Sequence, residues 1–193
     1  MKETLKLTIA LGIICAAAAL VLAFAQKATA PAQQAAQERQ QRESLKLVLP
    51  EFDNNPLEEP TEIDLENAPS VTFYPATKNG ELVGIAAEGN TEKGYGGTMT
   101  ILAGLKPDGT IRAVVVTDHS ETPGLGTQAT DRKRTAHISE AFTGNSKNEQ
   151  ENTLPPSEYL DQYTNKTTAQ PDNFALKSDG GTIDAVSGAT VSS

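Results

Sequence analysis

The stretch Asp184–Thr190, with the sequence DAVSGAT, lies almost at the end of the chain and joins one carboxylate and two hydroxyls with small residues. It contains no Lys, Arg, His or Cys, so it is poorly equipped for acid–base catalysis and for metal binding. An uncrowded turn around Gly188 would instead present the hydroxyl of Thr190 as the acceptor for chemistry that another molecule carries out. The alternative is a fraying terminus. These residues taken alone favour it, because short motifs often match by chance.

A second candidate is the loop Glu121–Gly126, with the sequence ETPGLG. Pro123 fixes its backbone φ, and the two glycines allow conformations and close approaches that other residues forbid. The pattern predicts a rigid loop that exposes backbone amides, the hydroxyl of Thr122 and the apolar side chain of Leu125. A planar aromatic ligand would rest on Leu125 while Thr122 and the amides bond its polar edge. For this loop alone, the alternative is a connector between a strand and a helix.

Other groups of reactive residues give weak signals. His119 and His137 are the only histidines, and no cysteine lies in the soluble part, so a zinc site would need carboxylates to complete it. His119-x-Glu121 lacks the i,i+4 partner of a helical metal motif, and we interpret His137 as a surface residue. The G-x-S-x-G elbow of a serine hydrolase does not occur. We therefore predict neither a metal site nor catalytic residues.

An acidic stretch between residues 51 and 66 contains no Lys or Arg. Its acids are Glu51, Asp53, Glu58, Glu59, Glu62, Asp64 and Glu66. Because they lack the Asp/Asn–Gly pattern of a calcium-binding loop, we interpret them as a solvated acidic face rather than a calcium site.

The charge of the chain narrows the classes of partner. The formal net charge is -9, from 16 Lys+Arg against 25 Asp+Glu. Residues 1–25 hold Lys2, Lys6 and Glu3 and contribute +1, so the remainder carries -10. This argues against nucleic-acid binding, because affinity for phosphate backbones comes mainly from Lys and Arg. Cys15, the only cysteine, lies in an apolar run, so the chain forms no internal disulfide.

Residues 7–25 form an uncharged run close to the length of about 20 residues that a bilayer core requires. Lys2 and Lys6 precede it, which places the N-terminus in the cytoplasm and the residues after 27 outside. The alternative is a cleaved signal peptide with Ala23–Ala25 as its A-x-A site, but the apolar core of a signal is usually shorter. We therefore predict a retained membrane anchor over residues 1–27.

Helix-forming residues dominate the next segment, so we predict a helical stalk over residues 28–50, with Pro50 ending the helix. The early part of this stalk has no substantial apolar stripe. The side chains able to dock on a globular body come at its end and are Leu45, Leu47, Val48 and Leu49. The domain proper is then predicted over residues 51–193.

Short strand patterns follow the acidic stretch, at residues 71–74, 81–88, 98–105 and 110–117. Asn79-Gly80 is a turn signal before the second of these. Lys106–Gly109, with the sequence KPDG, predicts a tight reversal that makes the last two a hairpin. We therefore predict an antiparallel sheet with flanking helices, an α+β fold.

The last third of the chain gives fewer signals. We predict a helix over residues 130–142, with Thr130 as its N-cap. Residues 145–172 are polar with little sign of regular structure, although Tyr159 and Tyr163 could anchor one helical turn. Two further short strands are predicted at residues 174–177 and 182–186.

Two loops with glycines and hydroxyls, Lys93–Gly97 and Glu121–Gly126, flank the predicted hairpin, and Ser187–Thr190 is a third. Together they resemble the FMN-binding subunits of membrane redox complexes: the G subunit of the Rnf complex and its relative, the C subunit of the sodium-pumping quinone reductase. His119 and the short chain favour the Rnf type. The matching stretches are the N-terminal span, LKLVLPEFDNNP at 45–56, GYGGTMTILAGLKPDGTIRAVVV at 94–116, HSETPGLG at 119–126 and DAVSGAT at 184–190.

This resemblance implies a covalent cofactor. In such proteins a flavin transferase joins FMN, through its phosphate, to the last threonine of a D-x-x-[S/T]-G-A-T motif, which here is Thr190. The other matching motif positions are Asp184, Ser187, Gly188 and Ala189. The ETPGLG loop lies beside the flavin ring in the family, so the implied contacts are Glu121, Thr122, Gly124 and Leu125, with Tyr95 a weaker candidate.

The resemblance also implies a place in the cell and a role. The chain would be a single-pass subunit in the cell inner membrane, with its domain outside the cytoplasm. It would relay electrons in an ion-translocating complex that transfers them between ferredoxin and NAD, and would not be an enzyme alone. Its expected partners are the other subunits and a flavin transferase. The alternatives are a secreted or anchored binding module without a redox role, and a stand-alone extracellular flavoprotein.

Three residues follow Thr190, whereas members of this family continue after the motif, usually into a helix. Three residues cannot complete a helical turn, whose first hydrogen bond spans four positions. The two interpretations are a sequence that is a piece of a longer protein and a copy that binds FMN less tightly.

Overall fold

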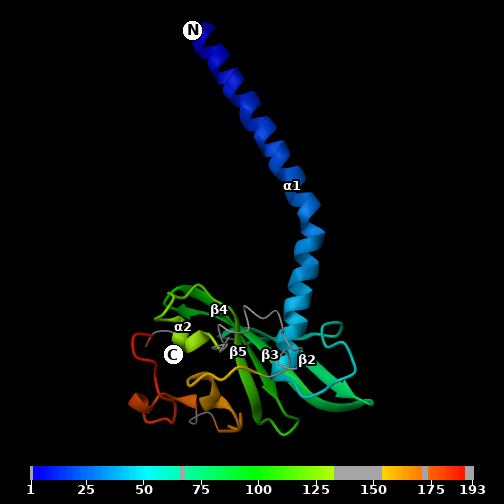
Figure 1. The fold of residues 1–193 in the computed structure, drawn as a ribbon, viewed down its shortest axis with the longest axis vertical. Coiled ribbons are helices and arrows are strands. Elements are labelled where there is room, and N and C mark those ends of the chain that lie inside the picture. Colours follow the sequence, from blue (N-terminus) through cyan, green and yellow to red (C-terminus); the bar gives the residue numbers. More distant parts are fainter. Residues whose placement is uncertain (1, 66–67, 133–153, 171–173, 190–193) are drawn as a thin grey trace, which may run out of the picture. The chain divides into compact units, whose positions relative to one another are not determined.

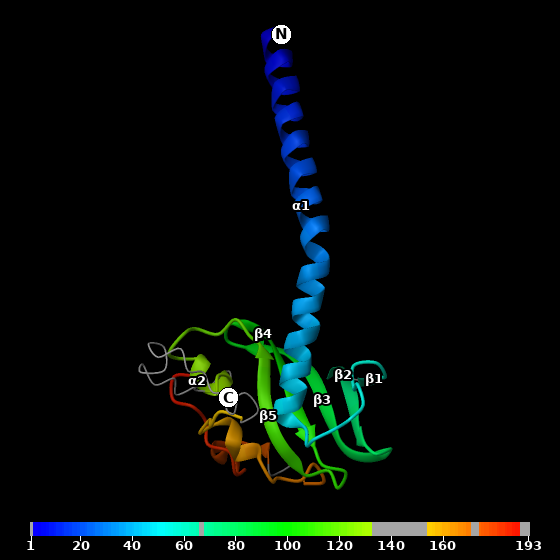
Figure 2. The same ribbon diagram turned by 45° about the vertical axis from the view of Figure 1, so that its right-hand side comes forward.

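The computed structural model describes residues 2–65, 68–132, 154–170 and 174–189. The chain divides into two compact units, Met1–Gln41 and Arg42–Ser193, shown as a ribbon in Figure 1 and turned in Figure 2. Of the sequence predictions, Thr190, His137 and the helical residues after Arg132 lie outside the described residues.

One helix, α1 (Lys2–Val48), carries both the apolar run and the predicted stalk. It continues through Pro31, although proline removes one backbone hydrogen bond inside a helix. Its N-terminal part is long and apolar enough to cross a membrane. Large apolar side chains on this part are more than half exposed: Ile9, Leu11, Ile13, Ile14, Leu20, Val21, Leu22 and Phe24. Such exposure suits lipid as the surrounding medium.

The second unit is built on a five-stranded sheet in which each strand pairs with the next, all antiparallel. Its strands are β1 (Thr61–Leu65), β2 (Ala68–Lys78), β3 (Glu81–Gly94), β4 (Gly97–Leu105) and β5 (Ile111–Asp118). The predicted antiparallel sheet and α+β class are confirmed. The strands predicted at 71–74 and 81–88 extend further than the sequence pattern indicated.

Both predicted turns are present. Asn79 and Gly80 have φ of 54° and 81°, as a type I′ hairpin turn requires, and they join β2 to β3. Between β4 and β5, the Gly109 amide donates to the Lys106 carbonyl at 2.9 Å, and Gly109 takes a φ of 79°. Residues that tolerate positive φ therefore set the register of the sheet.

The strand β1 lies in the acidic stretch and was not predicted. All five of its residues are exposed, including Glu62 and Asp64, which agrees with a solvated acidic face. The chain pairs here because β2 offers a partner: Ile63 lies opposite Val71, and Ser70 donates to the Glu62 carboxylate at 2.6 Å. The sequence pattern did not predict this strand, because the acids of the stretch outnumber the two apolar residues, Ile63 and Leu65, that alternate with polar ones in TEIDL.

One face of the sheet buries the end of α1. Leu45, Val48 and Leu49 are each at most 2% exposed. They share one core with sheet residues that are also buried: Tyr74, Ala76, Ala86, Leu102, Ala113 and Val115. A Cβ at Gly104 on β4 would lie 2.1 Å from the Val48 carbonyl oxygen, so only glycine permits this approach. The predicted docking is confirmed for Leu45, Val48 and Leu49, whereas Leu47 is half-buried and is not part of this core.

The other face of the sheet packs against the last part of the chain. Ile111 and Val114 of β5 share a core with Leu160 of the 3-10 helix η1 (Leu160–Tyr163) and with Ile183. In both ribbon views the segment after residue 154 runs beside β5 (Figures 1 and 2). The Ile111 amide donates to the Lys166 carbonyl at 2.8 Å, and the Asn165 amide donates back to Ile111 at 2.8 Å. This segment therefore pairs with the outer edge of β5.

The predicted start of a helix at Thr130 is wrong, and so are the two short strands predicted at residues 174–177 and 182–186. The helix α2 (Thr127–Thr130) begins directly after the ETPGLG loop, and Thr130 is its final residue, because Asp131 is extended. Burial of Ala129 and Thr130 holds this single turn in place.

Residues 174–177 and 182–186 form no strands; they share one parallel bridge between Leu176 and Ile183, with η3 (Lys177–Asp179) between them. A Cβ at Gly181 would lie 2.0 Å from the Ala175 carbonyl oxygen. Close packing of a compact loop therefore replaces a ladder here. The helical turn predicted around Tyr159 and Tyr163 is present as η1, with the two hydroxyls 2.8 Å apart.

Candidate functional site

The ETPGLG loop is a tight turn whose residues suit each position. The Leu125 amide donates to the Thr122 carbonyl at 3.2 Å, which places Pro123 and Gly124 in the two central positions. Gly124 has a φ of 80°. Proline second and a positive-φ glycine third are the preferences of a type II turn. The predicted rigidity of this loop thus has a defined backbone cause.

The start of α2 closes the loop. The Gly124 amide donates to the Thr127 hydroxyl at 2.8 Å, and the Gln128 side chain donates to the Gly124 carbonyl at 2.7 Å. The amides of Gly124 and Leu125 thus stabilise the loop itself instead of pointing to a ligand. Exposed at the surface are Thr122 and Leu125, whose exposed fraction is 52%.

Glu121 joins this loop to the turn between β3 and β4. Its residue is only 6% exposed, and its Oε1 accepts a hydrogen bond from the Gly96 amide at 3.1 Å. A Cβ at Gly94 would lie 2.9 Å from Oε1, and one at Gly126 would lie 2.2 Å from Oε2. Glycines of both loops therefore make room for one carboxylate. The structure gives Glu121 the role of holding two loops together.

The same two segments touch through their backbones. A Cβ at Gly96 would lie 2.1 Å from the Ser120 carbonyl oxygen. Beside it Tyr95 is 76% exposed, so the turn presents an aromatic ring at the surface. Close backbone packing explains why glycines flank this tyrosine.

His119 links the two ends of the loop region. Its Nδ1 accepts a hydrogen bond from the Glu121 amide at 3.3 Å, so its Nε2 carries the proton and donates to Asp131 Oδ1 at 2.7 Å. Among the described residues no group of three His, Cys, Asp or Glu side chains could hold a metal ion. His119 therefore has a structural role: its two hydrogen bonds connect the backbone at Glu121 to the side chain of Asp131.

Residues 184–189, the described part of the DAVSGAT stretch, form a turn beside this loop. The Ala189 amide donates to the Val186 carbonyl at 3.0 Å, and Gly188 has a φ of 84°. A Cβ at Gly188 would touch Leu125 Cδ2 at 3.4 Å, so the turn lies next to the tip of ETPGLG. Ser187 is exposed, whereas Ala189 is 5% exposed and packs in the core. The structure therefore brings together all three loops singled out from the sequence.

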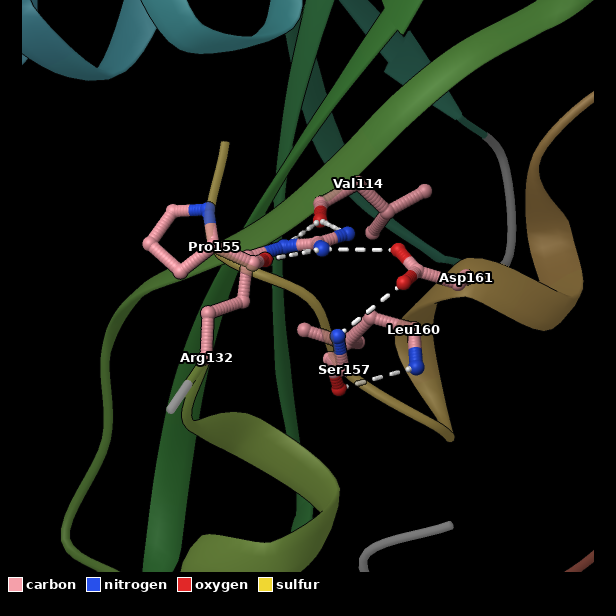
Figure 3. Close-up of polar contacts among 6 residues, drawn as sticks. All are labelled: Val114, Arg132, Pro155, Ser157, Leu160 and Asp161. Atoms are coloured by element: carbon pink, nitrogen blue, oxygen red, sulfur yellow. Dashed lines mark hydrogen bonds and ion pairs between the residues drawn. The ribbon is translucent and has the colours of Figure 1, made fainter. Parts of the chain in front are cut away.

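Arg132, which the sequence did not single out, has a side chain that is 7% exposed. Figure 3 shows its polar contacts with β5 and with the segment around η1. Its guanidinium donates to the Val114 carbonyl of β5 at 2.7 and 3.0 Å, and to the Pro155 carbonyl at 2.8 Å. It also pairs with Asp161 at 2.7 Å. Asp161 in turn accepts from the Ser157 amide at 3.0 Å. No local pattern identifies this network, because the partners of Arg132 lie 18 to 29 residues from it.

The exposed groups at the three loops fit a flavin. Leu125 and the ring of Tyr95 offer apolar surface to a planar aromatic system. Thr122 and Ser187 add exposed hydroxyls, and the missing side chain at Gly188 leaves space beside Leu125. FMN bound at these loops would supply electron transfer, and these residues would hold its ring and exclude water from one side.

Comparisons with known proteins identify the family of the chain. Residues 94–193, more than half of the chain, match the family model described as FMN-binding domain. The match begins at Gly94, the last residue of β3, and contains the ETPGLG and DAVSGAT stretches and all of the Lys93–Gly97 loop except Lys93.

Similar curated proteins are named as the G subunit of an ion-translocating oxidoreductase complex. The one from Methanosarcina acetivorans is 30% identical over 100% of this chain and 88% of its own length. The one from Stutzerimonas stutzeri is 31% identical over 95% of this chain and 72% of its own. The one from Haemophilus influenzae is 34% identical, but the match spans only 65% of its length. The chain belongs to the FMN-binding domain family and, within it, to the group formed by these G subunits.

We expect Gly126→Ala to destabilise the domain by about 2 kcal/mol, because the new methyl group would overlap the Glu121 carboxylate. The measurement is denaturant unfolding of the detergent-solubilised protein. In a Glu121→Ala background the cost should be smaller, since the two side chains compete for one space. Gly89→Ala is the matched control, because its Cβ would meet only Val71 at 3.8 Å. Equal costs of Gly126→Ala in both backgrounds would contradict the assignment.

Proposed function

We propose that this chain is a flavin-carrying electron-transfer subunit of an ion-translocating membrane redox complex, with FMN attached covalently to Thr190. The observation that supports it most is the meeting of three separate loops at one surface. Glu121 joins the turn at Gly96 to the ETPGLG loop, and Leu125 of that loop lies beside Gly188 of the attachment motif.

Each residue of the site has a proposed role. Thr190 provides the hydroxyl for the phosphoester, and the small Gly188 leaves room for the transferase that modifies Thr190. The residues proposed to contact the cofactor are Glu121, Thr122, Gly124, Leu125, Ser187, Gly188 and Ala189. Asp184 completes the motif; its carboxylate pairs with Lys177 at 2.6 Å at the surface. Glu121 acts mainly through the loops it holds together.

The attachment is a phosphoryl-group transfer catalysed by another protein. The Thr190 hydroxyl attacks the phosphorus of FMN in an activated phosphoanhydride, such as a flavin dinucleotide. The Oγ–P bond forms, the anhydride P–O bond breaks, the nucleotide monophosphate leaves and the hydroxyl proton goes to solvent. No electrons are transferred in this step.

Co-expression with a flavin transferase tests the attachment. We expect the intact mass to rise by one FMN less one water, with a fluorescent band in a denaturing gel. Thr190→Val should abolish both signals, because valine keeps the shape and removes the hydroxyl. Ser192→Ala is the matched control and should label like the wild type. An unmodified wild-type protein, or labelling that persists in Thr190→Val, would contradict the attachment.

We propose further that α1 is a retained anchor with its N-terminus in the cytoplasm and the domain outside. The support is the apolar run of α1, preceded by Lys2 and Lys6. In a Cys15→Ala background, a cysteine at Glu92 should react with an impermeant maleimide in right-side-out vesicles. A cysteine at Lys6 should react only after permeabilisation. The reverse pattern would contradict the orientation, and absence of the Lys6 segment from the mature protein would contradict the anchor.

The partners proposed for this chain are the other subunits of a membrane redox complex. The names of its relatives support this, since each is called part of an ion-translocating oxidoreductase complex. An affinity tag on the protein expressed in its own cells should recover other membrane subunits after mild detergent extraction. A variant with Val21 and Leu22 changed to Lys serves as the control for membrane dependence. Recovery of the wild type solely as a monomer would favour a stand-alone flavoprotein.

A further inference from the structure

The side chain of Gln162, which lies outside every predicted motif, bonds the first residue of the DAVSGAT stretch, here called the attachment stretch. The Asp184 amide donates to Gln162 Oε1 at 2.7 Å, and Gln162 Nε2 donates to the Asp184 carbonyl at 3.2 Å. The side-chain amide thus bonds both polar groups of one residue's backbone, as a neighbouring strand would do. Since Asp184 opens the DAVSGAT stretch, this contact sets where the stretch begins.

Gln162 is itself held in place by its neighbours on η1. Leu160 is 3% exposed, and the ring of Tyr163 stacks on Phe174 with centroids 6.3 Å apart. Asp161 pairs with Arg132, which also bonds the β5 backbone (Figure 3). Arg132 therefore holds η1 at a fixed place on the sheet, and η1 in turn fixes the position of Gln162.

The attachment stretch needs such a contact. Its residues Asp184 and Gly188 are exposed, and they lie between two buried residues, Ile183 at 0% and Ala189 at 5% exposed. Exposed segments with few buried contacts open easily. The other side-chain contact shown for Asp184 is the ion pair with Lys177, in which both side chains are more than half exposed, and such pairs contribute little.

We propose that Gln162 is the positioning residue of the attachment turn: it holds Asp184–Ala189 in the conformation in which the transferase modifies the next residue and the flavin then lies against Leu125. This inference rests on the proposed function. Gln162 does not touch the reacting atoms, and it acts through the backbone of Asp184. The sequence contained no sign of this, because Gln162 precedes Asp184 by 22 residues in a stretch of polar composition.

Amide hydrogen exchange of the unmodified full-length protein in detergent tests the contact without any flavin. In Gln162→Ala we expect the Asp184 amide to exchange roughly tenfold faster, because its acceptor is lost. Amides of β4 and β5 should keep wild-type rates. Gln170→Ala, at an exposed glutamine nearby in the sequence, is the control. It should change neither the exchange rate of the Asp184 amide nor the rates of the β4 and β5 amides. Wild-type exchange at Asp184 in Gln162→Ala would overturn the proposal.

Modification kinetics with a flavin transferase test the consequence. We expect kcat/KM for Gln162→Ala as the protein substrate to fall roughly tenfold, at an unchanged melting temperature. If Gln162→Ala unfolds, Gln162→Glu decides, since it keeps the size and the acceptor but loses the donor at neutral pH. Gln162→Glu should then be modified more slowly than wild type.

Wild-type kinetics in a folded variant at residue 162 would overturn the positioning role while leaving the proposed function intact. Failure of the wild type to accept FMN would overturn the proposed function instead, and the exchange result would still report on the contact. The two failures are therefore distinguishable.

Discussion

The burial of the Glu121 carboxylate is the constraint on which the candidate site depends. A carboxylate removed from water needs hydrogen-bond donors close by, and here the backbone of a glycine turn supplies one. The turn and the loop must therefore meet at close range, which only residues without a Cβ permit at Gly94, Gly96 and Gly126. This arrangement of the two loops places Leu125 next to Gly188.

The sheet provides the rigid part on which this meeting occurs. The antiparallel pairing of β3, β4 and β5 fixes the distance between the Gly96 turn at one end of β4 and the loop that follows β5. The end of α1 covers one face, and the segments around η1 and Ile183 cover part of the other. The candidate loops therefore extend from a sheet that packs against other segments of the chain on both faces.

Arg132 has a corresponding role for the segments that carry Gln162. Its four hydrogen bonds, one of them to a carboxylate, tie β5, Pro155 and η1 into one body. A planar guanidinium with several donors is suited to bonding carbonyls and a carboxylate at once, which lysine cannot match. Burial of such a group is tolerated because four hydrogen bonds replace those it would make to water, and the result is a fixed position for η1 and for Gln162 beside the attachment stretch.

Much of this protein could be read from local patterns. The apolar run, the two hairpin turns, the docking end of the stalk and the three glycine-containing loops were identified because each depends on neighbours in sequence: a proline or glycine that sets φ, or apolar residues at a regular period. Predictions failed where long-range contacts outweigh local preference. Thr130 is the last residue of α2 and begins no helix at residues 131 and 132, β1 forms because β2 lies beside it, and residues 174–186 pack as a loop.

The sequence by itself determined the class of fold, the apolar helix and the identity of the candidate loops, since these follow from residue types and their spacing. Tertiary structure alone decided that the loops meet and that Glu121 joins two of them. It also decided that Arg132 positions η1 and that Gln162 of η1 bonds the start of the third loop region, at Asp184. The physical reason is that hydrogen bonds of Arg132 and Gln162 link residues 18 to 29 positions apart, and Glu121 reaches back 25 positions to Gly96. Only the folded chain brings such residues within reach of one another.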